Sequence, residues 1–210
     1  MAPFFANESC EPFLPKEAPC VVGTYVQYAV DVRGVSDYQN TIRFAKEHNI
    51  RLVIRNTGHD YLGKSTGAYA LAIWTQNFKF AEVLDYASPE YTGKALRVSA
   101  GTQLIEAYRV AYDNGLVVVG GTCPSVGFAG GYSQGGGHGY LVSRYGLGAD
   151  QALEWEVVTM DGSHISASPS QNQDLYWALS GGGGGTYAAV VSLTSGLLCP
   201  TPWTKKTNRR

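Results

Sequence analysis

The stretch IRLVIRNTGHDY, residues 50–61, joins two patterns that decide the fold. Its first half, up to Ile54, is an apolar run with the length of a short buried strand. Its second half begins at Arg55 and is a polar cluster with a glycine and a histidine, which predicts a turn. Backbone N–H groups in such a turn can converge on an anion, and a pyrophosphate needs several donors of this kind. The stretch therefore predicts a strand followed by an anion-binding loop.

The sequence on either side of this stretch alternates strand and helix signals. Residues 21–32 are rich in β-branched and aromatic side chains and predict a strand. Ser36 is the predicted N-cap of a helix that runs to residue 48, and residues 50–55 form the next strand. This strand–helix–strand order predicts a parallel pair with a right-handed crossover.

The rest of the chain adds elements with other connections. Residues 153–160 and 164–167 predict a hairpin, because Asp161 and Gly162 between them favour a tight turn. A helix over residues 103–114 is expected to stop at Gly115. Further elements are expected at residues 70–74, 95–100, 117–119 and 187–194 as strands, and at residues 174–179 as a helix.

The expected fold class is α+β, with one domain of two lobes over residues 21–195. The first lobe, about residues 21–84, would hold a small parallel sheet with helices. The second lobe, about residues 95–195, would hold an antiparallel sheet with flanking helices, and the boundary is expected near residues 82–94. Residues 1–20 are predicted to be an irregular lead-in, and residues 196–210 a basic tail outside the domain.

Composition and charge exclude several classes of protein. Hydrophobic residues make up 44% and charged residues 16% of the 210 residues, which is typical of a globular domain. A net charge of −1 gives no basic footprint for nucleic acid. The longest apolar runs, such as LVVV at residues 116–119, are too short to span a membrane. The opening MAPFFA lacks the basic and apolar regions of a signal peptide.

Two of the four cysteines, Cys10 and Cys20, lie close together near the N-terminus. Asn7 begins an N-glycosylation sequon beside them, so the pair favours a disulfide and a secretory history. The alternative is two free thiols and a chance sequon.

The 26 glycines are concentrated at residues 120–148 and again at residues 181–185. Aliphatic and aromatic residues are interleaved with them, which is unlike a linker. A large planar cofactor that lies against backbone requires small residues of this kind. The chain has neither the G-x-G-x-x-G signature of a Rossmann unit nor a Walker lysine, so nicotinamide and nucleoside triphosphate sites are weak alternatives.

Six ordered motifs resemble a known family over about residues 20–195. They are RNTGHD (55–60), GTCPSVG (121–127), GGYSQGGGHG (130–139), YGLGAD (145–150), EWEVVT (154–159) and DLYWALSGGGGG (174–185). The chain resembles FAD-linked oxidases of the vanillyl-alcohol-oxidase and para-cresol-methylhydroxylase (PCMH) superfamily, in the fungal berberine-bridge-enzyme-like branch. Some members of that branch are isoamyl alcohol oxidases and others act in alkaloid pathways. The resemblance implies a PCMH-type FAD-binding domain with FAD between its lobes.

The resemblance also assigns a site. In this branch a histidine at the position of His59 bonds to the flavin 8α-methyl carbon, and a cysteine at the position of Cys123 bonds to the sixth carbon of the flavin ring. Imidazole and thiolate are nucleophilic enough for such links. Without the motifs, a lone histidine would be a surface residue and a lone cysteine core packing. Further residues expected to bind FAD are Arg55, Asn56, Thr57, Gly58, Asp60, Pro124, Val126, Gly127, Gly130, Gly131, Gly135, Gly137, Asp150 and Val157. His138 is a further candidate for a place near the flavin but is not assigned to the site, and no metal site is expected.

The implied reaction is hydride transfer from a small alcohol, sugar or amine (alkaloid) substrate to covalently bound flavin, with dioxygen as electron acceptor. The family continues beyond the strand near Thr194 into a substrate-binding domain that supplies the catalytic base, so we expect this chain to be truncated and to lack both. Family members are secreted or extracellular. Two alternatives are an FAD-binding fragment without independent turnover and a glycine-rich structural domain without flavin.

Overall fold

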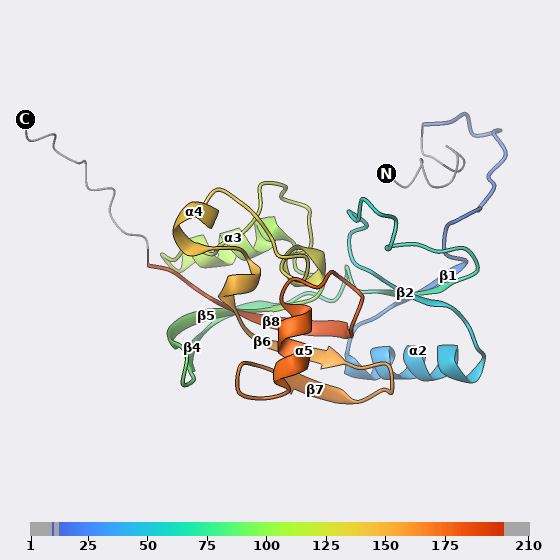
Figure 1. Cartoon of the computed structure of the whole chain (residues 1–210). Coiled ribbons are helices and arrows are strands. Elements are labelled where there is room, and N and C mark those ends of the chain that lie inside the picture. Colours follow the sequence, from blue (N-terminus) through green and yellow to red (C-terminus); the bar gives the residue numbers. More distant parts are fainter. Residues whose placement is uncertain (1–9, 11–12, 200–210) are drawn as a thin grey trace, which may run out of the picture.

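The computed structural model describes residue 10 and residues 13–199. Two sheets lie side by side, a three-stranded sheet in the order β1-β3-β2 and a five-stranded sheet in the order β4-β5-β8-β6-β7 (Figure 1). The small sheet is parallel and the large sheet antiparallel, which confirms the expected α+β class. The helices are α2 (Val35–Glu47), α3 (Leu104–Asp113), α4 (Val142–Tyr145) and α5 (Gln173–Leu179), with a π-helix η1 (Phe128–Tyr132) and a 3₁₀ turn η2 (Ala149–Gln151).

The small sheet consists of β1 (Tyr28–Asp31), β2 (Leu52–Arg55) and β3 (Leu71–Trp74). The predicted direct pairing of the first two strands is wrong, because β3 lies between them and pairs in parallel with both. β3 is the most buried of the three, whereas β1 is largely exposed, so the apolar strand takes the central place. The predicted first strand is also too long, since residues 21–27 form turns.

Helix α2 begins two residues earlier than predicted, and Ser36 does not cap it. Gly34 is the N-cap and contributes no side-chain hydrogen bond. The carboxylate of Asp37 instead accepts a 2.7 Å hydrogen bond from the backbone N–H of Arg33, just before the helix. An acidic side chain in the first turn therefore takes over the stabilisation expected from Ser36.

The large sheet consists of β4 (Ala81–Ala87), β5 (Thr92–Ser99), β6 (Ala152–Val158), β7 (His164–Ala167) and β8 (Ala189–Gly196). Strand β4 was not predicted, and it makes the antiparallel sheet begin at Ala81 rather than near residue 95. Its charged residues Glu82 and Asp85 are three positions apart, with Val83 and Leu84 both half-buried between them, so the strand lacks a regular alternation and its sequence signal is weak. The β6–β7 hairpin forms as predicted.

Two apolar clusters hold the molecule together. The larger lies between the five-stranded sheet and the helices α3, η1 and α5, and includes the fully buried Trp155. The smaller joins α2 and the small sheet to residues of β6 and β8, such as Val158 and Val191. Because the second cluster contains residues of both sheets, burial of its apolar surface fixes one sheet against the other.

The C-terminal end of the domain differs from the prediction, whereas the N-terminal cysteines agree with it. The tail expected from residue 196 still packs on the domain, since Leu197 is buried in the larger cluster and Leu198 pairs with Val117. Cys10 and Cys20 form a disulfide, the pairing that the sequence favoured. The sequon at Asn7 and residues 200–210 lie outside the described residues.

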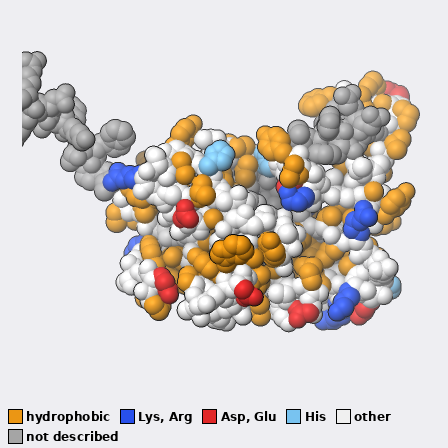
Figure 2. All heavy atoms as spheres, viewed as in Figure 1, with side chains coloured by type: hydrophobic (Ala, Val, Ile, Leu, Met, Phe, Trp, Pro, Cys, Tyr) orange, Lys and Arg blue, Asp and Glu red, His pale blue; other side chains and the backbone are white. Residues whose placement is uncertain are grey.

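Acidic and basic side chains are interspersed on the face shown in Figure 2, where neither sign forms a continuous patch. In the part of the chain that the structure describes, each helix is too short or too polar to cross a bilayer.

Candidate functional site

A cavity of about 410 Å³ opens where the loop after β2 faces the glycine-rich segment. Its volume is within the range of small-molecule sites, roughly 300–1,000 Å³. We call residues 55–65 the histidine loop and residues 120–148 the glycine block. The cavity is lined by Ile54, Asn56, Thr57, Gly58, His59, Asp60, Tyr61, Lys64, Ser65, Cys123, Val126, Gly127, Gly130, Gly131, Tyr132, Gly135, Gly183 and Gly184.

The histidine loop presents unpaired backbone donors to the cavity. Within the described structure, the N–H groups of Thr57, Gly58 and His59 donate to no other protein group. Gly58 has a φ of +85°, a left-handed conformation that suits glycine and turns the chain sharply after β2. Successive N–H groups in such a turn can form an anion-binding concavity.

Asp60 and Lys64 brace the far side of the histidine loop. The Asp60 carboxylate accepts hydrogen bonds from the backbone N–H groups of Leu62 and Lys64 and forms a 2.5 Å ion pair with the Lys64 ammonium. Partial burial raises the pKa of Asp60, but these contacts outweigh it, so the net pKa is lowered. The loop is therefore held by its own charges.

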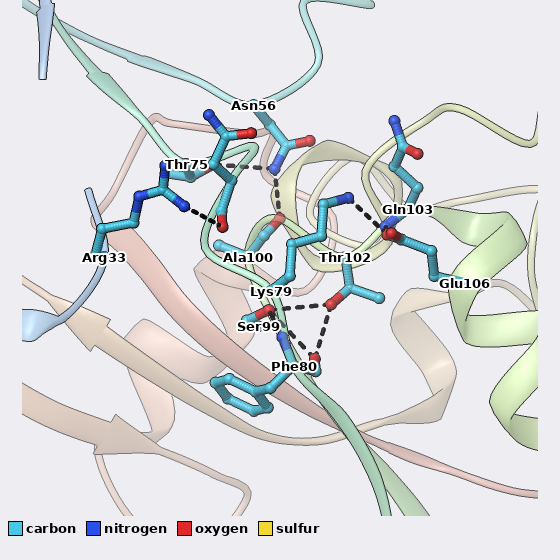
Figure 3. A network of polar contacts seen from close by, with 11 residues as sticks. Arg33, Asn56, Thr75, Lys79, Phe80, Ser99, Ala100, Thr102, Gln103 and Glu106 are labelled. Atoms are coloured by element: carbon cyan, nitrogen blue, oxygen red, sulfur yellow. Dashed lines mark hydrogen bonds and ion pairs between the residues drawn. The ribbon is translucent and has the colours of Figure 1, made fainter. Parts of the chain in front are cut away.

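Asn56 ties the histidine loop to both sheets. Its amide nitrogen donates to Thr75 Oγ1 at 2.9 Å, just after β3, and to the carbonyl of Ala100, just after β5 (Figure 3). The amide fills the space over Gly127 and Gly130, where a Cβ on either glycine would collide with it. Its buried Oδ1 has no partner in the described structure. The Asn56 side chain therefore packs directly against the backbone of Gly127 and Gly130 at the cavity lining.

The glycine block forms the opposite wall of the cavity. Gly131 lies in η1, and a Cβ built on it would meet no atom within 4 Å, so the backbone there faces open space. Tyr132 also lines the cavity, and its hydroxyl donates to the Gly137 carbonyl at 3.1 Å. Burial, together with Tyr108, raises the pKa of Tyr132 to about 12, so the hydroxyl stays protonated. Four glycines line this side of the cavity beside Tyr132, so much of the wall is backbone without side chains.

Three side chains meet at the mouth of the cavity. His59 Nε2 lies 2.9 Å from Ser125 Oγ, and the same oxygen lies 3.7 Å from Cys123 Sγ. Both His59 and Cys123 are exposed. The Ser125 hydrogen bond lowers the pKa of the Cys123 thiol. Two candidate nucleophiles from distant segments therefore share one hydroxyl.

Most of the predicted cofactor residues line this one cavity. They are His59, Cys123, Asn56, Thr57, Gly58, Asp60, Val126, Gly127, Gly130, Gly131 and Gly135. The lining residues that the sequence analysis missed are Ile54, Tyr61, Lys64, Ser65, Tyr132, Gly183 and Gly184. Ile54 and Tyr61 flank the RNTGHD motif, and Tyr132, Gly183 and Gly184 lie inside quoted motifs, where the run of five glycines at residues 181–185 was itself a signal. Lys64 and Ser65 lie four and five residues beyond RNTGHD, outside the quoted motifs. His138 is exposed and does not line the cavity.

Five predicted residues lie outside the cavity lining, and three of these have a clear structural role. Gly137 is needed because the Tyr132 ring occupies the place of its Cβ. Asp150 closes a turn by accepting a 2.7 Å hydrogen bond from the Leu147 N–H.

Pro124 lies at the start of α3, where its carbonyl accepts a 3.0 Å hydrogen bond from the Ile105 N–H. The remaining two predicted residues are Arg55 and Val157. The Arg55 guanidinium packs over Gly58, and the Val157 side chain is fully buried in β6.

These features fit FAD. Free N–H groups suit its pyrophosphate, and a wall of bare backbone admits a flat ring. The buried, unpartnered Oδ1 of Asn56 is a hydrogen-bond acceptor that the protein leaves unused. The described residues contain no cluster of three or more metal-ligating side chains.

Comparisons with known proteins agree with this fit. Residues 26–168 match the family described as FAD binding domain. The chain is 60% identical over 194 residues to the FAD-linked oxidoreductase sor8 of Hypocrea jecorina, covering 92% of this chain and 34% of that protein. The chain therefore spans about a third of the length of this curated relative.

Two crystal structures are similar over most of the chain. The VAO-type flavoprotein MtVAO615 from Myceliophthora thermophila C1 is 54% identical with a TM-score of 0.90, covering 93% of this chain and 36% of that one. Berberine bridge enzyme in complex with (S)-reticuline is 26% identical with a TM-score of 0.73, covering 82% and 34%. The chain therefore belongs to the FAD binding domain family, in its VAO-type branch, and FAD is its cofactor.

Proposed function

We propose that this chain is the FAD-holding part of an oxidoreductase, and that His59 and Cys123 both bond covalently to the flavin. The proposal rests chiefly on one observation. His59, after β2, and Cys123, in the glycine block, line the same cavity and lie within hydrogen-bonding reach of the same Ser125 oxygen.

The protein groups around the cavity have distinct roles in this proposal. The free N–H groups of the histidine loop hold the pyrophosphate, and Gly130 and Gly131 admit the flat ring. His59 and Cys123 fix the ring at one edge, which keeps it in place through repeated turnover. Bound flavin supplies a two-electron acceptor for a hydride from a substrate carbon.

Each covalent link must balance in atoms and electrons. A C–H bond of the flavin and an N–H or S–H bond of the protein are replaced by one C–N or C–S bond. Two protons and two electrons leave for each link, and dioxygen accepts them as hydrogen peroxide.

The proposed substrate is a small alcohol, sugar or amine, including an alkaloid, in fungal secondary metabolism. Two similar proteins support this class of reaction, since sor8 is an FAD-linked oxidoreductase and berberine bridge enzyme binds (S)-reticuline in its crystal structure. The base that removes the substrate proton is proposed to lie in a substrate-binding domain outside residues 1–210.

The second candidate is an FAD-binding fragment without independent turnover. The chain spans 34% of the length of sor8 and 36% of MtVAO615. The two candidates share the flavin site and differ only in whether the chain alone oxidises a substrate.

The test begins with the visible spectrum of the purified chain and of its acid-precipitated pellet. Covalent flavin stays yellow in the pellet, whereas dissociable flavin moves to the supernatant. We expect His59→Ala and Cys123→Ala each to remove one link, and the double variant to release all flavin. The matched controls are His48→Ala and Cys199→Ala, which remove an exposed residue of the same type away from the cavity. Flavin that is released from the unmodified chain would contradict the attachment proposal.

A second measurement separates the two candidates. The yellow chain is mixed with panels of alcohols, sugars and amines under air, and bleaching at 450 nm and hydrogen peroxide are followed. Bleaching with peroxide formation supports an oxidoreductase. A chain that dithionite reduces but no panel member bleaches supports the fragment without turnover.

A further inference from the structure

We propose that Ser125 is a positioning residue that prepares both attachment side chains through a single hydroxyl, making His59 and Cys123 nucleophilic together. This inference rests on the proposed covalent attachment of FAD.

The geometry allows one consistent arrangement of protons. A serine hydroxyl can donate one hydrogen bond and accept others. If His59 Nε2–H donates to Ser125 Oγ, the hydroxyl proton is free to point at Cys123 Sγ. In the neutral tautomer with this hydrogen bond the lone pair lies on Nδ1, and a developing thiolate receives a donor. The reverse arrangement spends the hydroxyl proton on Nε2 and leaves the sulfur without it.

The electrostatics around the thiol agree with this arrangement. The hydrogen bond from the Ser125 side chain is the largest cause of the lowered pKa of Cys123. A thiolate is the nucleophilic form of cysteine, so this donor raises reactivity near neutral pH. Lys64 is the lysine that lines the cavity, and its ammonium is already paired with Asp60. Ser125 therefore provides the thiolate stabilisation that a free cation provides elsewhere.

The local fold explains why Ser125 stays in place. Residues 123–126 form a turn in which the Val126 N–H donates to the Cys123 carbonyl at 3.4 Å, with Pro124 at the second position. The first N–H groups of α3 bind this turn, since Leu104 donates to the Val126 carbonyl at 2.9 Å and Ile105 to Pro124. Helix N-terminal donors that would otherwise lack partners thus hold Cys123 and Ser125 on one rigid turn.

The experiment compares Ser125→Ala and Ser125→Thr with a matched control, Thr122→Ala. Thr122 is an exposed hydroxyl residue one position before Cys123 that does not line the cavity. Two readouts are used on the full chain: the rate at which added FAD becomes acid-stable in chain prepared without flavin, and the pH profile of Cys123 alkylation by iodoacetamide. The second readout uses a Cys199→Ser background, so that Cys123 is the one free cysteine.

We expect Ser125→Ala to slow linkage about tenfold or more and to move the alkylation profile to higher pH. Ser125→Thr should restore both values, and Thr122→Ala should match the unmodified chain. Unchanged linkage and an unchanged alkylation profile in Ser125→Ala would overturn the proposal. If Ser125→Ala loses its circular-dichroism spectrum, Ser125→Gly replaces it, because a β-turn tolerates glycine at that position.

The two readouts also separate this inference from the attachment proposal. If the unmodified chain binds FAD without covalent links, attachment fails, and a shifted alkylation profile still supports the action of Ser125 on Cys123. If the unmodified chain links FAD normally and both Ser125→Ala readouts are unchanged, attachment stands and the role of Ser125 fails.

Discussion

The two walls of the FAD cavity are built by opposite means. The histidine loop presents polar groups, namely free backbone N–H groups, the His59 imidazole and the Asp60–Lys64 pair. The glycine block presents mainly backbone, with Tyr132 packed against Gly121 and Gly137, and it adds one candidate nucleophile, the Cys123 thiol. The histidine loop thus contributes most of the polar groups, and the glycine block contributes most of the bare backbone.

This difference has a consequence for mutation. A polar group at the surface of a loop can be removed at little expense to folding, because water replaces its contacts. A glycine whose Cβ position is already occupied by other atoms cannot gain a side chain without a shift of backbone. Substitutions at the close-packed glycines of the glycine block should therefore change folding. Substitutions of exposed side chains at the cavity, such as His59 in the histidine loop and Cys123 in the glycine block, should change flavin chemistry.

The largest effect is expected at Gly139. A Cβ on this residue would collide with the carbonyl oxygen and carbon of Gly120, which are backbone atoms of the same wall. We expect Gly139→Ala to destabilise the chain by about 3 kcal/mol. The melting temperature should fall by about 10 °C, as measured by circular dichroism.

The matched control for this prediction is Gly131→Ala, in the same glycine block. A Cβ on Gly131 would meet no atom within 4 Å, and the residue does not have a positive φ. Equal melting temperatures for Gly139→Ala and the unmodified chain would show that the close approach of Gly120 and Gly139 is not needed.

Asn56 is the residue most able to break the division, because it belongs to the histidine loop but supports the glycine block. Its amide joins Thr75 to Ala100 and covers Gly127 and Gly130. We expect Asn56→Ala to destabilise the chain by about 2 kcal/mol, because it leaves a buried carbonyl unpaired and opens a void. Urea unfolding measures this change.

Asn77→Ala is the control, since the amide of Asn77 donates to the exposed carboxylate of Asp31. Its effect should stay within about 0.5 kcal/mol. If Asn56→Ala changed the free energy of unfolding as little as Asn77→Ala does, contacts other than those of Asn56 would hold the histidine loop against the glycine block.

The sequence predicted the histidine loop better than it predicted the glycine block. RNTGHD follows an apolar strand directly, so strand, turn and donors are all encoded within a few neighbouring residues. The roles of Gly137 and Asp150 could not be predicted, because they depend on which side chain packs against them. The structure places Tyr132 against Gly137 and uses Asp150 to close a turn.

The same limit applies to the fold. Local patterns predicted α3, with its stop at Gly115, and the β6–β7 hairpin, because caps and turns are encoded locally. The central place of β3 depends on the relative burial of three strands distant in sequence. In the edge strand β4, the charged residues Glu82 and Asp85 interrupt the alternation of apolar and polar residues that would predict a strand.

Gly131 differs from the close-packed residues of the glycine block, because it has free space in front of it. Gly131→Ala should leave the melting temperature within about 2 °C, since the new methyl group meets no protein atom. The methyl group should project from the wall against which the flavin lies and weaken FAD binding by about 1 kcal/mol, or roughly fivefold. Flavin fluorescence quenching in the His59→Ala, Cys123→Ala background measures the dissociation constant without covalent links. Unchanged affinity would show that FAD does not lie against Gly131.

The smallest effect is expected at Asp60, and it concerns pH. The contacts with Lys64 and Leu62 lower the pKa of Asp60 below its ordinary value of about 3.9. Because the folded pKa is the lower one, this carboxylate stabilises the fold above pH 4, and that contribution is lost as pH falls through the folded pKa. After solvent screening the contribution is about 0.5 kcal/mol.

Asp60→Asn should therefore be less stable than the unmodified chain at pH 6, and it should lose less stability than the unmodified chain as the pH falls below about 4. Urea unfolding across that pH series measures both slopes. Lys64→Met should reproduce most of the change, and high salt should shrink the difference, because the ion pair is partly exposed. If Asp60→Asn lost stability more steeply with falling pH than the unmodified chain, the Asp60 carboxylate would oppose folding. The conformation of the histidine loop would then depend on its free N–H groups rather than on this ion pair.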